Sequence, residues 1–291
     1  MTDTTRAIPA FVNPEAGSAK EALEALRNHG GFDVREVQPD KLAEAIRQAV
    51  ADGAPRILVA GGDGTIGTAA AEILDSETEL AIFPGGTLNH FARDHGISTD
   101  PEVALALAAS GTARQVDVGM VNGHLFLNTS SVGAYVRFVK VRDYLEKRFG
   151  YRIASALAAI RVLFQFRKLT VSLEVEGQKR TYRTLLVFIG EGERELKLPM
   201  LGNRVTDGGS CLHLFVVRGR SRARLMTLAL NAAARGVETA ARMPDLDSFM
   251  VDRCTISVHR HTSVAVDGEL LTLAAPLEYV LRRDALRVVC P

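Results

Sequence analysis

Apolar and polar positions along the first 118 residues predict strands and helices in strict alternation. Short apolar runs at residues 8–12, 32–37, 56–60 and 80–83 have the length and composition of strands. Helical periodicity fills the segments between them. One helix begins at Ser18, a second begins at Lys41, and a third ends at Leu74. A further helix follows the fourth strand. Strands that alternate with helices form a parallel sheet covered on both faces, so we expect a three-layer α/β domain over residues 1–118.

After residue 118 the period changes to two, which is typical of antiparallel strands. Strand patterns occupy residues 170–175, 184–189, 212–217 and 255–258, and helical patterns interrupt them, one of them at Ala223 to Arg235. We expect a mainly antiparallel β-sandwich domain over residues 119–276. Two last strand patterns, at 277–281 and 286–289, lie in a closing segment, 277–291, that we expect to return to the first domain.

Composition narrows the class of protein. The 291 residues, 47% of them hydrophobic, suffice for two cores. The 35 Lys plus Arg against 34 Asp plus Glu leave a net charge of +1, which argues against a nucleic-acid binder.

The three cysteines are far apart and form no CxxC pair. The longest uncharged apolar run, Ile153 to Ile160, stops at Arg161. We expect a cytoplasmic protein without a signal peptide or a transmembrane helix.

The segment Gly61 to Thr65, GGDGT, follows a predicted strand and precedes a predicted helix. Its glycines let backbone N–H groups approach a phosphate at the start of that helix. A plain tight turn explains one such loop equally well. Two further loops, Asn13 to Ser18 and Pro84 to Asn89, follow neighbouring strands, and the carboxyl ends of parallel strands line one crevice. The three loops together therefore predict a polyphosphate site, and the chain has no GxxxxGK[ST] motif of the Walker type.

With NPEAG at Asn13 to Gly17 and GTLNHFARDHGI at Gly86 to Ile97, the GGDGT loop resembles the diacylglycerol kinase catalytic domain. Further matching pieces follow in the family's order at residues 115–119, 128–133, 206–209 and 266–269, so the resemblance covers almost the whole chain. Sphingosine, ceramide and NAD kinases belong to the same superfamily. The resemblance implies an NAD kinase and diacylglycerol kinase-like fold, with an ATP-binding α/β domain and a lipid that enters between the domains.

The resemblance also implies the site. The residues that it places around ATP are Asn13, Gly17, Gly61, Gly62, Asp63, Gly64, Thr65, Gly86, Thr87, Asn89, Gly268 and Glu269. Asp267 would be the general base that accepts the proton of the lipid hydroxyl while Mg²⁺ offsets charge on the phosphates. From the residues alone, Asp267 and Gly268 favour a type I′ hairpin turn, and only the position in the family's order favours the catalytic role.

Three acids are candidate Mg²⁺ ligands. A carboxylate beside ATP is repelled unless a cation stands between them, which gives Asp63 a role in organising metal or water. Family members bind a structural Mg²⁺ through acids such as Asp117 and Asp207, whose other interpretations are a strand-end cap and a turn residue. The resemblance places an acid in many relatives where this chain has His90, and a Glu where it has Thr68, so we expect an altered metal network here.

The stretch Arg137 to Lys168 holds nine Lys or Arg and two acids, interleaved with aromatic and aliphatic residues. It predicts either a surface that rests on anionic lipids or an ordinary core helix with a solvated basic face. With a lipid substrate, the first alternative gives peripheral membrane association. A homodimer is compatible with the sequence.

Other functions stay open at this point. The acceptor could be ceramide, a sphingoid base or NAD, although NAD kinases usually carry an Asn-Glu or Asn-Asp pair that is absent after the third loop. A regulatory protein that binds nucleotide without turnover is the non-enzymatic alternative. The intact GGDGT loop and Asp267 favour an ATP-dependent lipid kinase that acts on diacylglycerol or a related glycerolipid.

Overall fold

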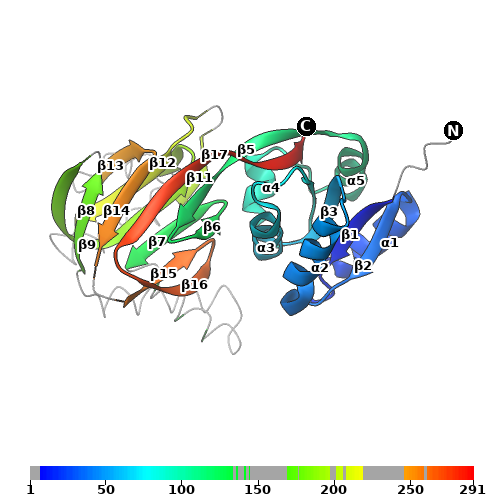
Figure 1. Cartoon of the computed structure of the whole chain (residues 1–291), viewed down its shortest axis with the longest axis horizontal. Helices are drawn as coiled ribbons and strands as arrows, with labels where there is room; N and C mark the ends of the chain where they lie inside the picture. Colours follow the sequence, from blue (N-terminus) through cyan, green and yellow to red (C-terminus); the bar gives the residue numbers. More distant parts are fainter. Residues whose placement is uncertain are drawn as a thin grey trace, which may run out of the picture. The chain divides into compact units, whose positions relative to one another are not determined.

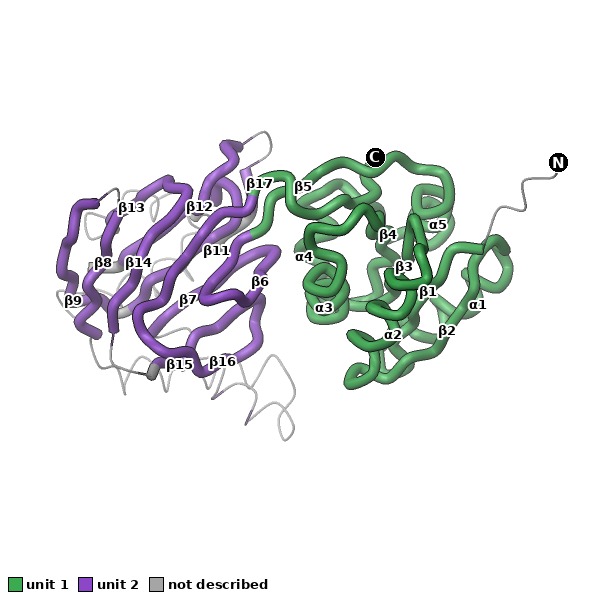
Figure 2. Tube along the Cα trace, viewed as in Figure 1, with its two compact units in different colours: residues 1–118, 283–291 green, residues 119–282 purple. Residues whose placement is uncertain are grey.

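The computed structural model describes residues 7–133, 136, 141, 144, 169–175, 177–196, 201–205, 208–218, 246–258 and 261–291. The chain forms two compact units, unit 1 with residues 1–118 and 283–291 and unit 2 with residues 119–282 (Figure 2). The last strand, β17 (Leu277–Cys290), has its first half in unit 2 and its second half in unit 1. The helix predicted at Ala223 to Arg235 and the basic stretch from Arg137 to Lys168 lie outside the described residues, apart from single positions.

Unit 1 is an α/β domain. Its strands are β1 (Ile8–Val12), β2 (Phe32–Glu36), β3 (Arg56–Gly61), β4 (Glu79–Pro84) and β5 (Thr112–Val121). Its helices are α1 (Ala19–His29), α2 (Pro39–Ala51), α3 (Asp63–Ile73), α4 (His90–Asp94) and α5 (Pro101–Ser110). The parallel sheet has the order β2-β1-β3-β4-β17, and β5 pairs with β17.

Helices cover both faces of this sheet (Figure 1). Alternate strand residues, among them Val12, Leu58 and Phe83, pack with α1 and α5, while α2 contacts α3. Strands β3 and β4 are buried at all but their first residue, as parallel strands covered on both faces are. The predicted three-layer α/β class is confirmed.

The local differences from the predicted elements have physical reasons. Helix α2 begins at Pro39 rather than Lys41, because the fixed φ of proline suits the first helical position. The single helix predicted after β4 is two helices, and the second begins where the Asp100 side chain accepts the Val103 N–H at 3.0 Å. The two closing strands are one, β17, which passes through Asp284 with φ 52°.

Arg56 ties together the amino-terminal ends of two strands and the end of α5. Its guanidinium donates to the Glu79 carboxylate at 2.6 and 2.9 Å and to the carbonyls of Ala108 and Gly111 at 2.7 and 2.8 Å. The two charged side chains are only 15% and 20% exposed. Removing one partner of such a pair leaves a charge with little water around it.

We therefore expect Arg56→Ala to lower the free energy of unfolding by about 2 to 4 kcal/mol. The matched control is Arg47→Ala, because Arg47 makes a 2.8 Å ion pair with Glu72 but is 59% exposed. The control should lose less than about 1 kcal/mol. Urea denaturation followed by circular dichroism measures both, and equal losses would show that the Arg56 network adds nothing beyond a surface ion pair.

Unit 2 is an antiparallel β domain. Its strands are β6 (His124–Phe126), β7 (Thr129–Gly133), β8 (Leu169–Val175), β9 (Gln178–Glu191), β10 (Arg194–Leu196), β11 (Leu201–Arg204), β12 (Leu212–Arg218), β13 (Leu246–Val251), β14 (Arg253–Ser257), β15 (His261–Val266), β16 (Glu269–Ala274) and the first half of β17. They pair in the order β16-β15-β7-β9-β8-β14-β17, with β12 on β9, β13 on β12, and β10 with β11 as a separate ribbon. Their buried apolar residues form one core cluster, which confirms the predicted β class.

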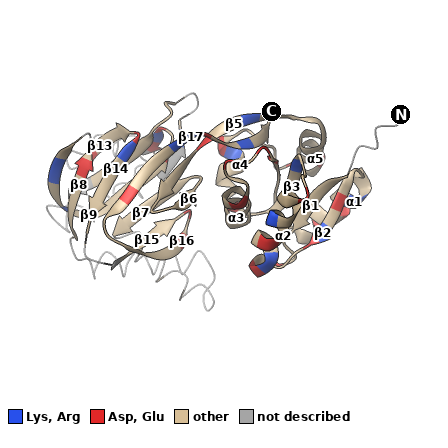
Figure 3. Ribbon diagram, viewed as in Figure 1, with Lys and Arg blue, Asp and Glu red and all other residues tan. Residues whose placement is uncertain are grey.

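Acidic and basic residues are interspersed along the described elements of both units (Figure 3). This distribution follows from a composition with nearly equal numbers of the two signs. No helix within the described ranges is long and apolar enough to span a bilayer.

Candidate active site

The GGDGT loop lies where β3 ends and α3 begins. Gly61 ends the strand, Gly62 precedes the helix and Asp63 opens it. The Ile66 N–H donates to the Gly62 carbonyl at 3.0 Å, so the N–H groups of residues 63–65 lie ahead of the helical hydrogen-bond ladder. These groups, with the positive end of the helix dipole, form the kind of site that binds a phosphate.

Gly64 and Thr65 form the first turn of α3. Gly64 is exposed, and its carbonyl accepts the Thr68 hydroxyl at 3.0 Å. A Cβ on Gly61 would lie 2.6 Å from the Thr65 side chain, so these two residues are in close contact. Thr68, which stands where many relatives carry a Glu, is bound to its own helix and brings no charge to the loop.

The third loop is held in a tight ring by Asn89. Its backbone is left-handed, with φ 47°, and its side chain is buried. The Oδ1 atom accepts the Gly86 N–H at 2.8 Å, and Nδ2 donates to the Gly86 carbonyl at 2.9 Å. A Cβ on Gly86 would lie 2.6 Å from the Cα of Gly62, so the second and third loops touch through backbone that only glycine allows. Thr87 is exposed at the tip of the ring.

The first loop joins the third. Within it, Asn13 Oδ1 accepts the Glu15 N–H at 2.9 Å, and Gly17 is exposed. The Ser18 hydroxyl donates to the Gly85 carbonyl at 2.7 Å instead of capping α1. Sequence reasoning placed Ser18 at the end of the first loop and the start of a helix, and did not predict this bond to the third loop. The three loops that the sequence predicted to converge therefore do so in unit 1.

Asp63 makes contacts that the sequence did not predict. One carboxylate oxygen accepts the backbone N–H of His90 at 3.2 Å, and the other accepts that of Phe91 at 3.1 Å. The carboxylate thus caps α4 from a distance in sequence. Asp63 was expected to organise metal or water, and its role toward a metal stays a prediction.

Of the other two predicted metal ligands, the structure describes one. Asp117, on β5, accepts the Asp284 N–H at 3.0 Å, and Asp207 lies outside the described residues. Among the described residues no cluster of three His, Cys, Asp or Glu side chains is arranged to hold a metal ion. This donor set does not form a protein cage, but it fits a Mg²⁺ held by one or two carboxylates and the nucleotide's phosphates.

In unit 2, Asp267 and Gly268 are the two central residues of a hairpin turn. Val266 pairs with Glu269, and the two residues between them have φ 45° and 90°, as a type I′ turn requires. Glu269 is exposed at the start of β16. The turn that the residues predicted is therefore present, and it leaves the catalytic role open.

The Asp267 carboxylate accepts three backbone N–H groups. Leu127 donates to one oxygen at 2.6 Å, and Asn128 and Thr129 donate to the other at 2.9 and 2.8 Å. The Asp267 N–H donates to the Thr129 carbonyl at 2.8 Å. The carboxylate is therefore fixed in direction.

A buried group of charges lies next to the segment that Asp267 holds. The Glu191 N–H donates to the Asn128 carbonyl at 2.9 Å, and the Glu191 carboxylate lies 3.0 Å from Arg204 Nη1 and 3.7 Å from Arg194 Nη2. Glu191 and Arg194 are nearly inaccessible. Sequence reasoning missed this cluster, because charged residues are expected at the surface and no motif marks these.

His213 extends this cluster. Its Nδ1 accepts the Arg194 N–H at 3.0 Å, and its Nε2 lies 2.7 Å from the Ser248 hydroxyl. Burial lowers the pKa of the His213 imidazole, with Glu193 opposing the shift and Arg194 adding to it. The neutral ring supplies the acceptor that the Arg194 N–H needs.

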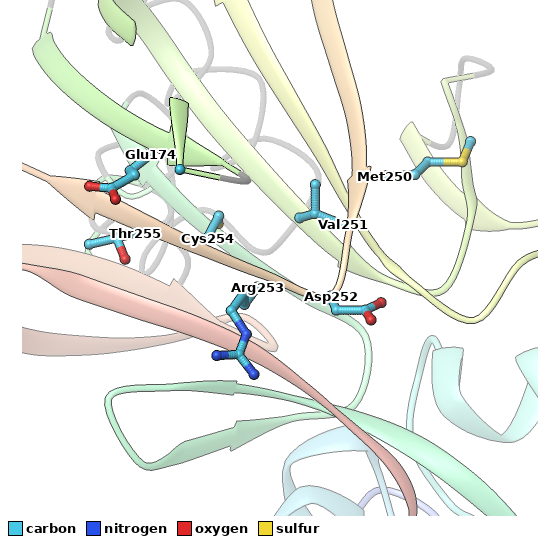
Figure 4. Close-up of a pocket in the computed structure, with 8 residues that line it drawn as sticks. Glu174, Met250, Val251, Asp252, Arg253, Cys254 and Thr255 are labelled. Atoms are coloured by element: carbon cyan, nitrogen blue, oxygen red, sulfur yellow. The ribbon is translucent and has the colours of Figure 1, made fainter. Parts of the chain in front are cut away.

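A cavity of about 480 Å³ lies elsewhere in unit 2, on β8, β13 and β14 (Figure 4). Its lining includes Glu174, Asp252, Arg253 and Cys254. Among the described residues that line this cavity, none is a predicted site residue. Burial raises the pKa of the Cys254 thiol to about 12, so the thiol is protonated at neutral pH. The cavity is not part of the nucleotide loops.

Comparisons with known proteins agree with this geometry. The diacylglycerol kinase catalytic domain family matches residues 8–121. A probable lipid kinase YegS-like from Pseudomonas aeruginosa (strain UCBPP-PA14) is 44% identical over 90 residues, 30% of this chain and 30% of that protein. The chain thus matches less than a third of the length of this relative. A diacylglycerol kinase from Mycobacterium tuberculosis is 31% identical over 219 residues, 70% of this chain and 67% of that protein.

Solved structures share the fold. A putative diacylglycerol kinase from Bacillus anthracis str. Sterne superposes with a TM-score of 0.75 at 22% identity, over 98% of this chain and 97% of that one. The match to the catalytic-domain family begins at β1 and ends at β5, and so contains all three loops. The match to the diacylglycerol kinase of Mycobacterium tuberculosis is longer than this domain. The chain therefore belongs to the diacylglycerol kinase family.

Proposed function

We propose that the protein is an ATP-dependent lipid kinase that phosphorylates a hydroxyl group of diacylglycerol or a related glycerolipid. The observation that carries the proposal is the convergence of the three glycine-rich loops of unit 1 at the start of α3. Membership of the diacylglycerol kinase family supports the lipid acceptor. The α3 N-terminus and the backbone of the third loop would bind the triphosphate of ATP.

The proposed reaction is a direct phosphoryl transfer. The lipid hydroxyl oxygen forms a bond to the γ-phosphorus of ATP, and the bond between that phosphorus and the β,γ-bridging oxygen breaks, so that ADP leaves. The proton of the hydroxyl passes to a carboxylate, for which Asp267 is the proposed acceptor. Three N–H donors hold this carboxylate in one direction, and a fixed direction is what a general base needs.

The proposal includes Mg²⁺, which when bound offsets charge on the phosphate oxygens. We assign Asp117 as a ligand of this ion. Asp207, which lies outside the described residues, is the second candidate ligand. Gly268 and Glu269 follow Asp267 in the same turn and are proposed to face the nucleotide.

Peripheral membrane contact is part of the proposal, because a glycerolipid with two acyl chains stays in a bilayer. The basic stretch from Arg137 to Lys168 is our candidate for this contact on sequence grounds. A homodimer also remains a prediction, which sedimentation of the purified protein tests.

The proposed function predicts which acceptor takes label from radioactive ATP. Detergent micelles or anionic phospholipid vesicles that contain diacylglycerol should give a labelled lipid, with ceramide, a sphingoid base and NAD giving at least about tenfold less. Pelleting of the anionic vesicles measures membrane binding, which added salt should weaken. Labelling of NAD in preference to every lipid would contradict the proposal.

A further inference from the structure

The Asp63 carboxylate connects two of the three nucleotide loops. It belongs to the first residue of α3, and it accepts the N–H groups of the first two residues of α4, at 3.2 Å from His90 and 3.1 Å from Phe91. Each oxygen takes one donor, so both are engaged in fixing where α4 begins. Helix α4 is five residues long, too short to hold its own position without such contacts.

The position of α4 in turn sets the third loop. Asn89 lies immediately before the helix and clamps Gly86 through both atoms of its amide. Gly86 lies against Gly62, at the start of α3. A chain of contacts therefore links the start of α3 to the third loop and back, through Asp63, α4, Asn89, Gly86 and Gly62. A shift of Asp63 would move the backbone that we propose to bind the phosphates.

These contacts also explain how the Asp63 carboxylate can lie beside a bound triphosphate, which repels it. Two hydrogen bonds from backbone N–H groups hold the Asp63 carboxylate, and the positive end of α3 lies beside it. No metal ion is needed to hold the carboxylate in place.

We infer that Asp63 is a positioning residue, which keeps the third loop in the geometry that binds ATP and does not act as a primary ligand of Mg²⁺. The inference rests on the proposed function, because ATP is the ligand that the third loop would bind. The contact of the Asp63 carboxylate with the backbone of α4 does not depend on that function. The positioning role and the proposed function can therefore fail separately.

The chain offers a matched control for the test. Asp100 also caps a helix of unit 1, accepting the Val103 N–H at 3.0 Å at the start of α5, a helix that Asp63 does not contact through these hydrogen bonds. Asp63→Ala and Asp100→Ala each remove a capping carboxylate, and each should lower the midpoint of thermal unfolding by a similar amount. Asp63→Asn keeps one acceptor oxygen but turns an amide N–H toward a backbone donor, so it should fall between wild type and Asp63→Ala.

The readouts are ATP affinity by calorimetry, with and without Mg²⁺, and amide hydrogen exchange of residues 86–94. Asp63→Ala should weaken ATP binding on the order of tenfold in both conditions and speed exchange in this segment, while Asp100→Ala changes neither. A defect of Asp63→Ala that disappears without Mg²⁺ would overturn the inference in favour of a metal ligand. Unchanged affinity and exchange in folded Asp63→Ala would overturn it as well. A wild-type protein that binds no ATP, with faster exchange in Asp63→Ala, would refute the proposed function and leave the positioning role supported.

Discussion

Gly62→Val is expected to weaken ATP binding at least about a hundredfold, a loss of about 2.8 kcal/mol, while the protein stays folded. Gly62 has an extended backbone that any residue can adopt, so valine is compatible with its φ and ψ. A Cβ at this position would lie 3.2 Å from the Cα of Gly86, and the two methyl groups of valine would extend into the space where phosphate oxygens approach the α3 N–H groups. Calorimetry with ATP measures the effect.

Gly67→Val is the matched control for this prediction. Gly67 lies on the same helix, and nothing stands within 4 Å of a Cβ added there. Valine is no worse than glycine in a helix interior, so the control should bind ATP as wild type does. Equal affinity of the folded Gly62 variant and wild type would place the phosphate site away from α3.

Asp267→Asn is expected to lower kcat at least about a hundredfold with little change in ATP affinity, the scale for loss of a positioned general base. Asparagine keeps the oxygen that can accept the Asn128 and Thr129 N–H groups, so most of the turn should survive. Its amide nitrogen would face the Leu127 N–H, and the unsatisfied donor should cost about 1 to 3 kcal/mol of stability. Steady-state kinetics and thermal unfolding, measured on one preparation, separate the two effects.

Asp284→Asn is the control for Asp267→Asn. Asp284 also has a left-handed backbone, with φ 52°, and asparagine adopts this conformation readily, so turnover should be unchanged. If the Asp267 variant lost stability but kept wild-type kcat, the carboxylate would serve only to anchor residues 127–129.

The positions of the three loops were predictable from sequence for a definite physical reason. Short apolar strands followed by glycine-rich turns place each loop at the carboxyl end of a parallel strand, and β1, β3 and β4 are adjacent in the sheet. The Asp267 to Gly268 turn was equally readable, because a two-residue Asp-Gly turn between strands favours the I′ conformation.

The direction of individual side chains was not predictable. A carboxylate beside a phosphate loop suggests a metal ligand, yet the Asp63 oxygens accept N–H groups from a helix more than twenty residues away in sequence. The Ser18 hydroxyl likewise binds a carbonyl of another loop. The buried Glu191 and Arg194 contradict the rule that charges lie at the surface, and the pairing of β10 with β11 brings Arg204 to the same carboxylate.

Phosphorus NMR of ATP, Mg²⁺ and diacylglycerol in detergent micelles with the purified wild-type protein is the most direct test of lipid kinase activity. The account predicts that the γ-phosphate signal falls while a lipid phosphomonoester and ADP rise in equal amounts. Release of inorganic phosphate without a lipid phosphomonoester, or no loss of the γ-phosphate in a preparation that binds ATP, would contradict it.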